Sequence, residues 1–382
     1  MRVLIALTYY RPHYSGLTIY AERLAKALVQ KGHAVTVLTS RYASNLPQSE
    51  VADGVEIIRL PVGLRISKGV LMPGMLSKAW ELVRQNDVVH LHLPQLDAAY
   101  LAMVARLLRK PVVLTYHCDL RLPAGLIHSL ANQVSHIANH ITARAANLLV
   151  TNTQDYAEQS DFLKHYLEKI RIVPPPVELP PLDNADLDQF KQNYAILPGQ
   201  RIIGMAARLA TEKGVEYLVQ ALPRVLEKFP SARVLFVGQY RDVFGEHAYA
   251  QMLAPVIEKL GEHWQFLGVI PPHEFAAFMH VAEVTVLPSL NSTESFGMVQ
   301  VESMVCGTPV VASDLPGVRQ PVMMTGMGRL IPRGDSQALA EAIISILDHP
   351  EQYRGDVNAI AERFSPEAVA EAYATLFQEL LA

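Results

Sequence analysis

The sequence predicts an α/β protein of two Rossmann-like domains, each with a parallel sheet covered by helices. Three observations support this fold class. Strand-like apolar runs alternate with helical segments along most of the chain. The alternation occurs twice, before and after a proline-rich segment at 174–181. Half of the 382 residues are hydrophobic and 18% are charged, which supplies enough apolar material for two buried cores.

The first series of strands precedes the proline-rich segment. Buried parallel strands read as nearly continuous apolar runs, and six such runs occur: Val3–Tyr9, Ala34–Thr39, Val55–Leu60, Val88–Leu93, Pro111–Tyr116 and Asn147–Thr151. Helices are expected between most of them, for example at Thr18–Gln30 and Ala98–Leu108.

The second series restarts the alternation after the prolines. Its predicted strands are Ile202–Ala206, Val234–Val237, Trp264–Val269, Val284–Pro288, Pro309–Ala312 and Arg329–Ile331. Helices fit between these runs, as at Val215–Phe229, and the chain ends in two helical segments, Ser336–Leu347 and Glu367–Leu381.

These patterns divide the chain into domains at 1–176 and 177–365, with a helix at 366–382 that we expect to pack back on the first domain. Two doubly wound domains on one linker are expected to face each other across a cleft. The carboxyl ends of the strands in both sheets would then contact a ligand.

Composition narrows the functional classes. Cys118 and Cys306 form no metal-ligand or disulfide spacing, which favours a reducing compartment. No signal peptide or membrane span is expected, because the longest uncharged stretch, Leu122–Ala143, contains many polar residues. Residues 1–180 carry a net charge of +6 and residues 181–382 one of −10. We expect a cytoplasmic protein without a nucleic-acid partner; its basic half favours an anionic partner or merely a differently charged surface.

The segment Glu294–Glu302 (ESFGMVQVE) follows a predicted strand and begins a helix. Free backbone N–H groups at such a start bind phosphate, and Gly297 would permit close approach. Eight helical residues span about 12 Å, more than the roughly 5–9.5 Å between paired glycosidase carboxyls. Direct hydrolysis is therefore disfavoured, and Glu294 and Glu302 suit two ends of a long ligand. The alternative is an acidic first turn with one solvated glutamate.

The segment Arg208–Gly214 (RLATEKG) follows another predicted strand. Arg208 and Lys213 would flank a loop at the strand's carboxyl end, where two cations neutralise a diphosphate leaving group. The alternative is a charged surface loop. Lys213 precedes a helix start, where a cation opposes the helix dipole, and this favours a functional reason for its presence.

Two further loops lie in the first half of the chain. Pro12–Thr18 (PHYSGLT) places Gly16 at a helix entry, where a glycine is usually a turn residue. Thr115–Asp119 (TYHCD) puts His117 and Asp119 at a strand end, as ligand contacts or as structural side chains. His90 and His92 share one face of a strand without a third metal ligand, so packing or cleft lining is preferred.

Taken in order, these motifs resemble the nucleotide-sugar glycosyltransferases of the GT-B fold, the retaining "group 1" or family-four class. RLATEKG is followed about eighty residues later by ESFGMVQVE. The segments SGLTIYAERLAKALVQKGHAVTVLTS, VVHLHLP, TYHCD and MVCGTPVVASDLPG also match that family's pattern. The resemblance covers nearly the whole chain.

The resemblance implies a role for each matching residue. Arg208 and Lys213 would bind the donor diphosphate, Glu294 the hydroxyls of the donor sugar and Glu302 the ribose. The remaining contacts would come from the amides of Phe296, Gly297 and Met298, from His117 beside the transferred sugar, and from the loop at Gly16.

This chain departs from the family pattern at three places. Ser15 stands before Gly16 where a second glycine is common, and Thr18 stands where an acidic residue is common. Gly238 is followed by Gln239 and Tyr240 instead of a Gly-x-Gly pattern. The first two departures affect expectations about donor sugar and acceptor, and the third concerns the surroundings of the nucleotide.

The sequence therefore predicts a retaining hexosyltransferase that uses a nucleoside diphosphate sugar and needs neither metal nor cofactor. The resemblance implies that the leaving diphosphate helps to deprotonate the acceptor hydroxyl on the same face of the sugar. Two alternatives are a nucleotide-sugar epimerase of the same fold and a non-catalytic sugar-nucleotide-binding protein. The sugar, the base, the acceptor and the oligomeric state are left open.

The acceptor prediction concerns the segment 124–143. Ile127, Leu130, Val134, Ile137 and Ile141 have helical spacing and form one apolar face, and the other side holds His128, Ser135, His136 and Asn139. We expect this helix to border an acceptor groove, with His128 and His136 joining Asp119 as acceptor contacts. A sugar acceptor or a lipid-linked one at a membrane surface would fit. The alternative is a core helix with an uncharged outer face and a soluble acceptor. His136 and His140 lack a third metal ligand.

Overall fold

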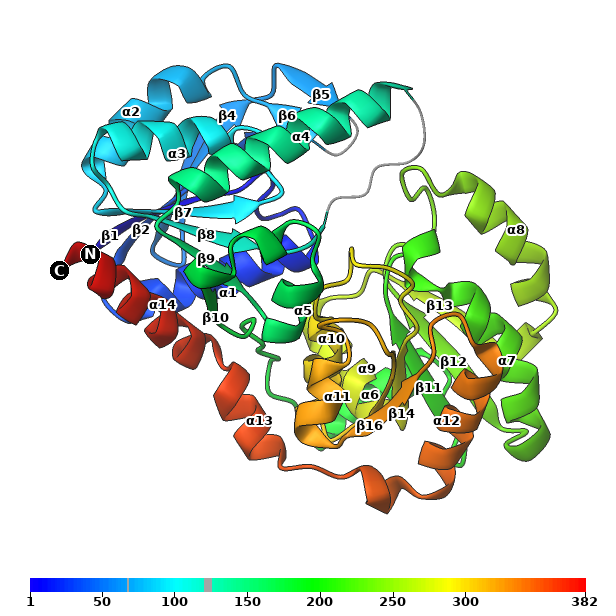
Figure 1. The fold of residues 1–382 in the computed structure, drawn as a ribbon. Helices are drawn as coiled ribbons and strands as arrows, with labels where there is room; N and C mark the ends of the chain where they lie inside the picture. The colour runs from blue at the N-terminus through cyan, green and yellow to red at the C-terminus, as the bar shows by residue number, and fades with distance from the viewer. Residues whose placement is uncertain (67–68, 120–125) are drawn as a thin grey trace. The chain divides into compact units, whose positions relative to one another are not determined.

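The computed structural model describes residues 1–66, 69–119 and 126–382. These residues form two compact units, one of Met1–Pro176 together with Phe364–Ala382 and one of Val177–Arg363. Each unit is built around its own parallel sheet with helices packed on it (Figure 1). The predicted class of two parallel-sheet α/β domains is confirmed.

The described residues of the first unit form a sheet in the order β10-β9-β8-β7-β1-β2-β4-β3. Only β3, at the edge, runs antiparallel to its neighbour. The strands are Arg2–Ala6 (β1), Ala34–Arg41 (β2), Ser49–Ala52 (β3), Val55–Pro61 (β4), Val88–Leu93 (β7), Val112–Tyr116 (β8), Leu148–Thr151 (β9) and Ile170–Ile172 (β10). The chain runs from β1 to β2 in one direction and later from β7 to β8 in the other, so the order reverses between β1 and β7.

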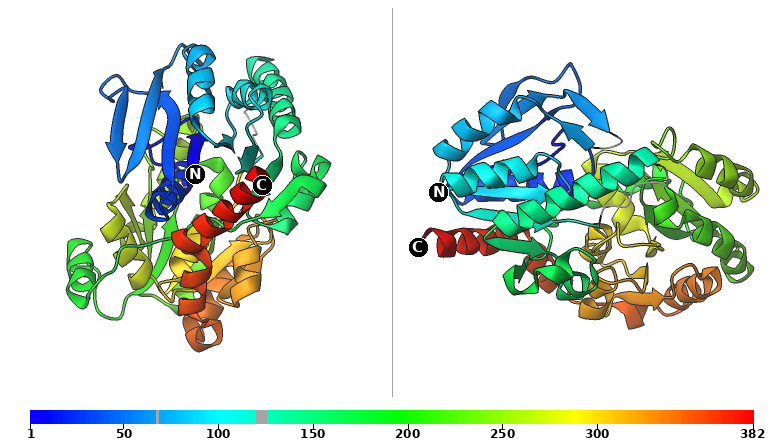
Figure 2. Two further views of the ribbon diagram at one scale, coloured as in Figure 1. Left: turned by 90° about the vertical axis from the view of Figure 1, so that its left-hand side faces the viewer. Right: turned by 45° about the horizontal axis from the view of Figure 1, so that its top comes forward.

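Helices cover both faces of this sheet (Figure 1). One face carries Met75–Gln85 (α2), Ala98–Leu107 (α3) and Leu126–Ala145 (α4), and α3 packs against both others. The other face carries Gly16–Gln30 (α1) and the C-terminal helix Pro366–Leu381 (α14), which pack on each other (Figure 2). Among the described residues, smaller elements are the antiparallel strands Leu64–Ile66 (β5) and Gly69–Leu71 (β6), the helix Gln154–Gln159 (α5) and the 3-10 turns Leu163–His165 and Leu167–Lys169.

The second unit has a parallel sheet in the order β13-β12-β11-β14-β15-β16. Its strands are Arg201–Ala206 (β11), Ala232–Val237 (β12), Trp264–Gly268 (β13), Val284–Leu287 (β14), Val310–Ser313 (β15) and Gly328–Ile331 (β16). The order reverses between β11 and β14, which are neighbours in space although β12 and β13 separate them in sequence.

The helices of the second unit enclose a core on each face of this sheet. They are Asn184–Asn193 (α6), Val215–Lys228 (α7), His247–Glu258 (α8), Pro272–Val281 (α9), Met298–Met304 (α10), Gln320–Thr325 (α11), Ser336–Asp348 (α12) and Val357–Phe364 (α13). Three 3-10 turns occupy Thr211–Lys213, Gly261–His263 and Pro350–Tyr353.

Candidate functional site

The two strongest sequence motifs meet at the point where the second sheet reverses its strand order. RLATEKG follows β11 and ESFGMVQVE follows β14, and these strands are adjacent and parallel. In open parallel sheets, such a reversal leaves a crevice outside the carboxyl ends of the strands where ligands bind. The fold therefore brings together two segments that lie about eighty residues apart in the sequence.

Backbone contacts hold the two loops against each other. The N–H of Leu290 donates to the carbonyl of Glu212 at 2.9 Å. Gly214 has a φ of +65°, and a Cβ there would lie 2.2 Å from the carbonyl oxygen of Pro288. Only glycine fits both the left-handed backbone and this close approach.

Both cations of the RLATEKG loop have a carboxylate partner. Lys213 Nζ lies 2.6 Å from Glu294 Oε2, and each side chain is 18% exposed. Arg208 Nη2 lies 2.9 Å from Glu212 Oε1, and the Arg208 side chain is more open to solvent. The structure thus joins the two motifs through Lys213 and Glu294. Glu212, which the motif reading passed over, is the partner of Arg208.

Gly297 closes the loop before α10. It has a φ of +77°, and a Cβ there would lie 2.3 Å from Leu287 Cδ2. Helix α10 begins at Met298, directly after it, and Phe296 is buried. The side chain of Gln300 is fully buried and donates to the carbonyls of Phe296 at 2.8 Å and Val318 at 2.9 Å. Gln300 therefore fixes the loop. The sequence feature that could have indicated this role is a polar residue between the two valines of MVQVE.

Glu302 lies about one helical turn after Met298, where α10 begins, and is 7% exposed. Burial, and after it the charge of Glu302, raises the pKa of the Cys306 thiol to about 12. The thiol therefore stays protonated near neutral pH and acts as a packing group rather than a nucleophile.

Gly16 begins α1 at the point where the first sheet reverses its strand order. Ser15 caps the helix by accepting from the backbone N–H of Thr18 at 3.2 Å. Thr18 is fully buried, and its hydroxyl donates to the carbonyl of Tyr9 at 3.3 Å. Both departures from the family pattern thus stabilise the loop and the helix start locally.

His117 follows β8 and belongs to a cluster of three imidazoles. His92 Nδ1 lies 2.8 Å from His117 Nε2, and the two rings are stacked at 14°. His90 and His92 are fully buried on β7, as packing side chains are. Burial lowers the pKa of His90 and of His117 to about 3 and that of His92 well below its ordinary value. All three rings are therefore neutral at pH 7.

A chain of hydroxyl groups connects this cluster to the C-terminal helix. His90 Nε2 lies 2.7 Å from Thr115 Oγ1, and the Tyr373 hydroxyl lies 2.7 Å from both Thr115 Oγ1 and the hydroxyl of Tyr20. The buried polar groups of β7, β8 and α1 thus share partners with α14, which makes α14 part of the first unit's core.

Asp119 makes structural contacts. Its Oδ1 accepts from the hydroxyls of Tyr116 at 3.0 Å and Ser160 at 2.7 Å, and its backbone N–H donates to Tyr156. These bonds tie the end of β8 to the α5 region. The fold places Asp119 two residues after His117, but two hydroxyls already occupy one of its carboxylate oxygens.

Helix α4 turns its apolar residues outward. Val134, Ile137 and Ile141 are 52%, 61% and 40% exposed, whereas Ser135 and Asn139 are buried. In the part of α4 whose side chains the structure describes, the predicted apolar face is therefore not turned into the core. Helix α4 packs on α3, and the hydroxyl of the buried Thr142 donates to the carbonyl of Ala138 at 2.8 Å.

The two histidines predicted on this helix have different surroundings. His136 is exposed. His128 lies within α4, but its side chain is outside the described part of the structure. The nearby His140 hydrogen-bonds to the hydroxyl of Tyr166 through Nδ1 at 2.7 Å. Within the described ranges, no group of three His, Cys, Asp or Glu side chains is placed to hold a metal ion, and no helix has the length and apolar character needed to cross a membrane.

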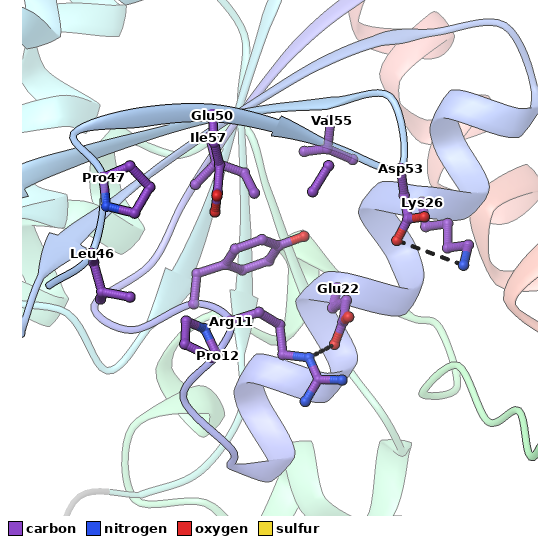
Figure 3. Close-up of a pocket in the computed structure, with 12 residues that line it drawn as sticks. Arg11, Pro12, Glu22, Lys26, Leu46, Pro47, Glu50, Asp53, Val55 and Ile57 are labelled. Carbon is purple, nitrogen blue, oxygen red and sulfur yellow. Dashed lines mark ion pairs between the residues drawn. The ribbon is translucent and has the colours of Figure 1, made fainter. Parts of the chain in front are cut away.

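A separate cavity of about 350 Å³ lies in the first unit, beside α1 and the β3–β4 edge (Figure 3). Its charged side chains are neutralised in pairs: Arg11 with Glu22, Lys26 with Asp53, and Glu50 with the buried Arg59. Among the described residues, none of those predicted to contact donor or acceptor lines it. The cavity therefore offers no uncompensated charge that would select a charged ligand.

Comparisons with known proteins agree with this architecture. The family described as glycosyl transferases group 1 matches residues 186–363, and the glycosyl transferase 4-like domain matches residues 15–176. The chain is 30% identical over 344 residues to phosphatidyl-myo-inositol mannosyltransferase of Mycobacterium leprae, covering 87% of this chain and 83% of that protein. It is 26% identical over 355 residues to D-inositol 3-phosphate glycosyltransferase of Pseudarthrobacter chlorophenolicus, covering 88% and 82%.

Solved structures show the same fold. Sucrose-phosphate synthase from Thermosynechococcus elongatus aligns with a TM-score of 0.77 at 24% identity, over 99% of this chain and 98% of that one. Anabaena HepE in complex with UDP-glucose aligns with a TM-score of 0.78 at 21% identity, over 99% and 100%. The two parallel-sheet domains thus define a protein of the GT-B class. The chain belongs to the group 1 glycosyltransferases.

Proposed function

We propose that this protein transfers a hexose from a nucleoside diphosphate sugar to an acceptor hydroxyl with retention of the anomeric configuration. The observation that carries the proposal is the meeting of Lys213 and Glu294 at the strand-order reversal of the second sheet. That arrangement supplies a cation and a carboxylate where parallel sheets bind ligands. The named relatives, all transferases of glycosyl groups, support the reaction class.

Each donor contact has a physical role in this proposal. Arg208 and Lys213 bind the diphosphate and stabilise the charge that develops on it as the bond to the sugar breaks. The amides of Phe296, Gly297 and Met298 add donors at the start of α10. Glu302 accepts from the ribose hydroxyls, and Glu294 from hydroxyls of the sugar.

Because Lys213 is paired with Glu294, donor binding would exchange the partner of Lys213. Without donor, the carboxylate of Glu294 neutralises Lys213. When the donor binds, the diphosphate replaces Glu294 as the partner of Lys213, and Glu294 turns to the sugar hydroxyls. Neither partly buried charge is then left without a partner, which would otherwise cost several kcal/mol.

The reaction proceeds on one face of the sugar. The acceptor oxygen bonds to the anomeric carbon on the side from which the diphosphate departs, and the acceptor proton passes to a diphosphate oxygen. His117 contacts the transferred sugar from the first unit. The cations and amides stabilise the leaving group, so we propose that the reaction needs no metal ion.

The acceptor is proposed to be a hydroxylated anionic compound, such as an inositol phosphate or its lipid-linked form. The names of the relatives support this choice, because they refer to phosphatidyl-myo-inositol and D-inositol 3-phosphate. The net charge of +6 over residues 1–180 is also complementary to a phosphorylated acceptor.

A lipid-linked acceptor requires contact with a lipid surface, and one face of the first unit suits it. We call the packed helices α2, α3 and α4 the α2–α4 layer. Its exposed large apolar side chains are Leu76, Trp80, Met103, Leu107, Val134, Ile137 and Ile141. Exposed basic side chains on the same helices and their ends are Arg84, Arg106, Arg109 and Arg144. Apolar residues interspersed with arginine suit the headgroup region of an anionic bilayer, and we propose that surface as the occupant.

A donor and acceptor screen tests the proposal. Binding and turnover are measured with UDP-, GDP- and ADP-sugars, each with and without inositol, inositol phosphate and phosphatidylinositol in detergent. One donor should turn over rapidly only when an acceptor is present and yield a glycoside. Conversion of the donor sugar to its epimer without acceptor would establish the epimerase instead. Tight donor binding without any turnover would establish a binding protein.

A further inference from the structure

His92 holds the ring of His117 from within the core. The side chain of His92 is fully buried on β7, and its Nδ1 lies 2.8 Å from Nε2 of His117. The rings stack at 14° with centroids 5.1 Å apart. Tyr20 meets the ring of His117 edge-on, with centroids 4.9 Å apart. The His117 ring is therefore packed on two sides, and its Nε2 lies within hydrogen-bond distance of His92.

The hydrogen bond between two neutral imidazoles requires one N–H donor and one bare nitrogen acceptor. Either His92 donates from Nδ1, or His117 donates from Nε2. In the second case, His92 would carry its proton on Nε2, which is buried and has no hydrogen-bond partner within the described chain. Burying an unpaired N–H is costly, and orphaned donors are rarer in proteins than orphaned acceptors. The first arrangement is therefore preferred.

We propose that His92 is a positioning residue that donates from Nδ1 to Nε2 of His117 and thereby fixes His117 as the tautomer protonated on Nδ1. This inference rests on the proposed function only for its catalytic consequence. With its proton on Nδ1 and its Nε2 accepting from His92, His117 would have no bare nitrogen left to accept the acceptor proton. This agrees with proton transfer to the leaving diphosphate.

The test compares His92→Asn with His92→Leu in the full-length chain. The amide of asparagine places an N–H donor near the position of Nδ1, whereas leucine fills the space without one. Nitrogen-15 NMR of the imidazoles reports which nitrogen of His117 carries the proton. We expect the Nδ1–H form in the wild type and in His92→Asn, and a mixture of tautomers in His92→Leu. The variant His90→Gln, which retains a donor toward Thr115, should leave the tautomer of His117 unchanged.

Kinetics supply the second readout. His92→Leu should lower kcat about tenfold, or about 1.4 kcal/mol of barrier, with a smaller change in the KM for donor, and His92→Asn should restore most of the rate. A wild-type His117 protonated on Nε2, or a His92→Leu spectrum identical to that of the wild type, would overturn the proposal. If His92→Leu does not fold, the wild-type spectrum alone decides it. If the tautomer follows His92 but His117→Ala retains full activity, the role of His117 in transfer fails while the positioning by His92 stands.

Discussion

The Nζ atom of Lys213 lies 2.6 Å from Oε2 of Glu294, and both side chains are largely buried. The structure thus pairs two residues that the sequence assigned to different parts of the same ligand. Their pairing explains how a partly buried lysine and glutamate are kept stable in the donor-free protein. It also means that variants at either position change the environment of the other.

Removing one of the two cationic side chains proposed to bind the diphosphate tests the donor site. Lys213→Ala and Arg208→Ala should each lower kcat/KM about 100- to 1000-fold, because loss of one positioned electrostatic group costs about 2.7–4 kcal/mol of barrier. Steady-state kinetics with a saturating acceptor measure the effect. The control is Arg224→Ala, which removes a surface pair with Glu341 in the same unit and should leave the rate nearly unchanged. A near-normal rate for either site variant would show that the diphosphate binds elsewhere.

Substitutions of Glu302 and Glu294 are expected to change different kinetic constants. Contacts to the ribose are the same in the ground state and the transition state, so Glu302→Ala should raise the KM for donor with little change in kcat. Glu294→Ala should lower kcat as well, because the sugar changes its charge and shape during transfer. Donor titrations and single-turnover rates separate binding from chemistry. The opposite pattern would exchange the two assignments.

Metal removal tests the proposed charge stabilisation by Arg208, Lys213 and backbone amides. Activity in excess EDTA should remain within about twofold of that in buffer. This change is far smaller than the roughly 100-fold loss expected when one positioned charge is missing. The control is a glycosyltransferase known to depend on a metal ion, assayed in the same buffer, which should lose its activity. Complete loss of activity that Mg²⁺ or Mn²⁺ restores would contradict metal independence.

The buried histidines predict the acid sensitivity of the protein. The pKa of His90 is lowered from 6.5 to about 3 by burial, so the unfolded chain binds a proton there that the folded chain does not. The free energy of unfolding should therefore fall as the pH decreases from about 6.5 toward 3 and be unaffected by this group above that range. Melting temperatures measured across pH should fall less steeply for His90→Gln, which retains a donor toward Thr115. The exposed His247→Gln provides the control; equal slopes in all three proteins would refute the assignment.

Much of the fold follows from local sequence patterns. Runs such as Val88–Leu93, buried at every position, identify central parallel strands because both faces of such strands are covered by helices. The edge strand Ser49–Ala52 was not predicted: all four of its residues are exposed, so it carries no apolar pattern. The antiparallel pair Leu64–Ile66 and Gly69–Leu71 is similarly short and was also missed.

The site could be predicted where its residues lie within one short segment of the sequence. It could not be predicted where contacts depend on the order of the strands in the sheet. The motifs around Lys213 and Glu294 could be recognised separately, but their ion pair follows from the adjacency of β11 and β14. The contact of His92 with His117 likewise requires β7 and β8 to be neighbours. For α4, periodicity showed an apolar and a polar face but not which one is buried; in the structure Val134, Ile137 and Ile141 are exposed, and Ser135 and Asn139 are buried.

The α2–α4 layer should bind anionic lipid surfaces. Sedimentation with vesicles of phosphatidylglycerol and phosphatidylcholine should capture the protein at low salt, less so at 0.5 M salt, and little with phosphatidylcholine alone, since the attraction of arginines to anionic lipid is screened by salt. Ile137→Asn should weaken partitioning about tenfold, because burial of one large aliphatic side chain contributes about 1.5–3 kcal/mol. Met252→Asn, on the exposed face of α8 in the second unit, is the matched control and should bind as the wild type does. Equal loss in both variants would indicate a general effect of surface polarity. No binding at low salt, together with normal transfer to inositol phosphate in solution, would show that the exposed side chains of α4 serve another purpose and that the acceptor is soluble.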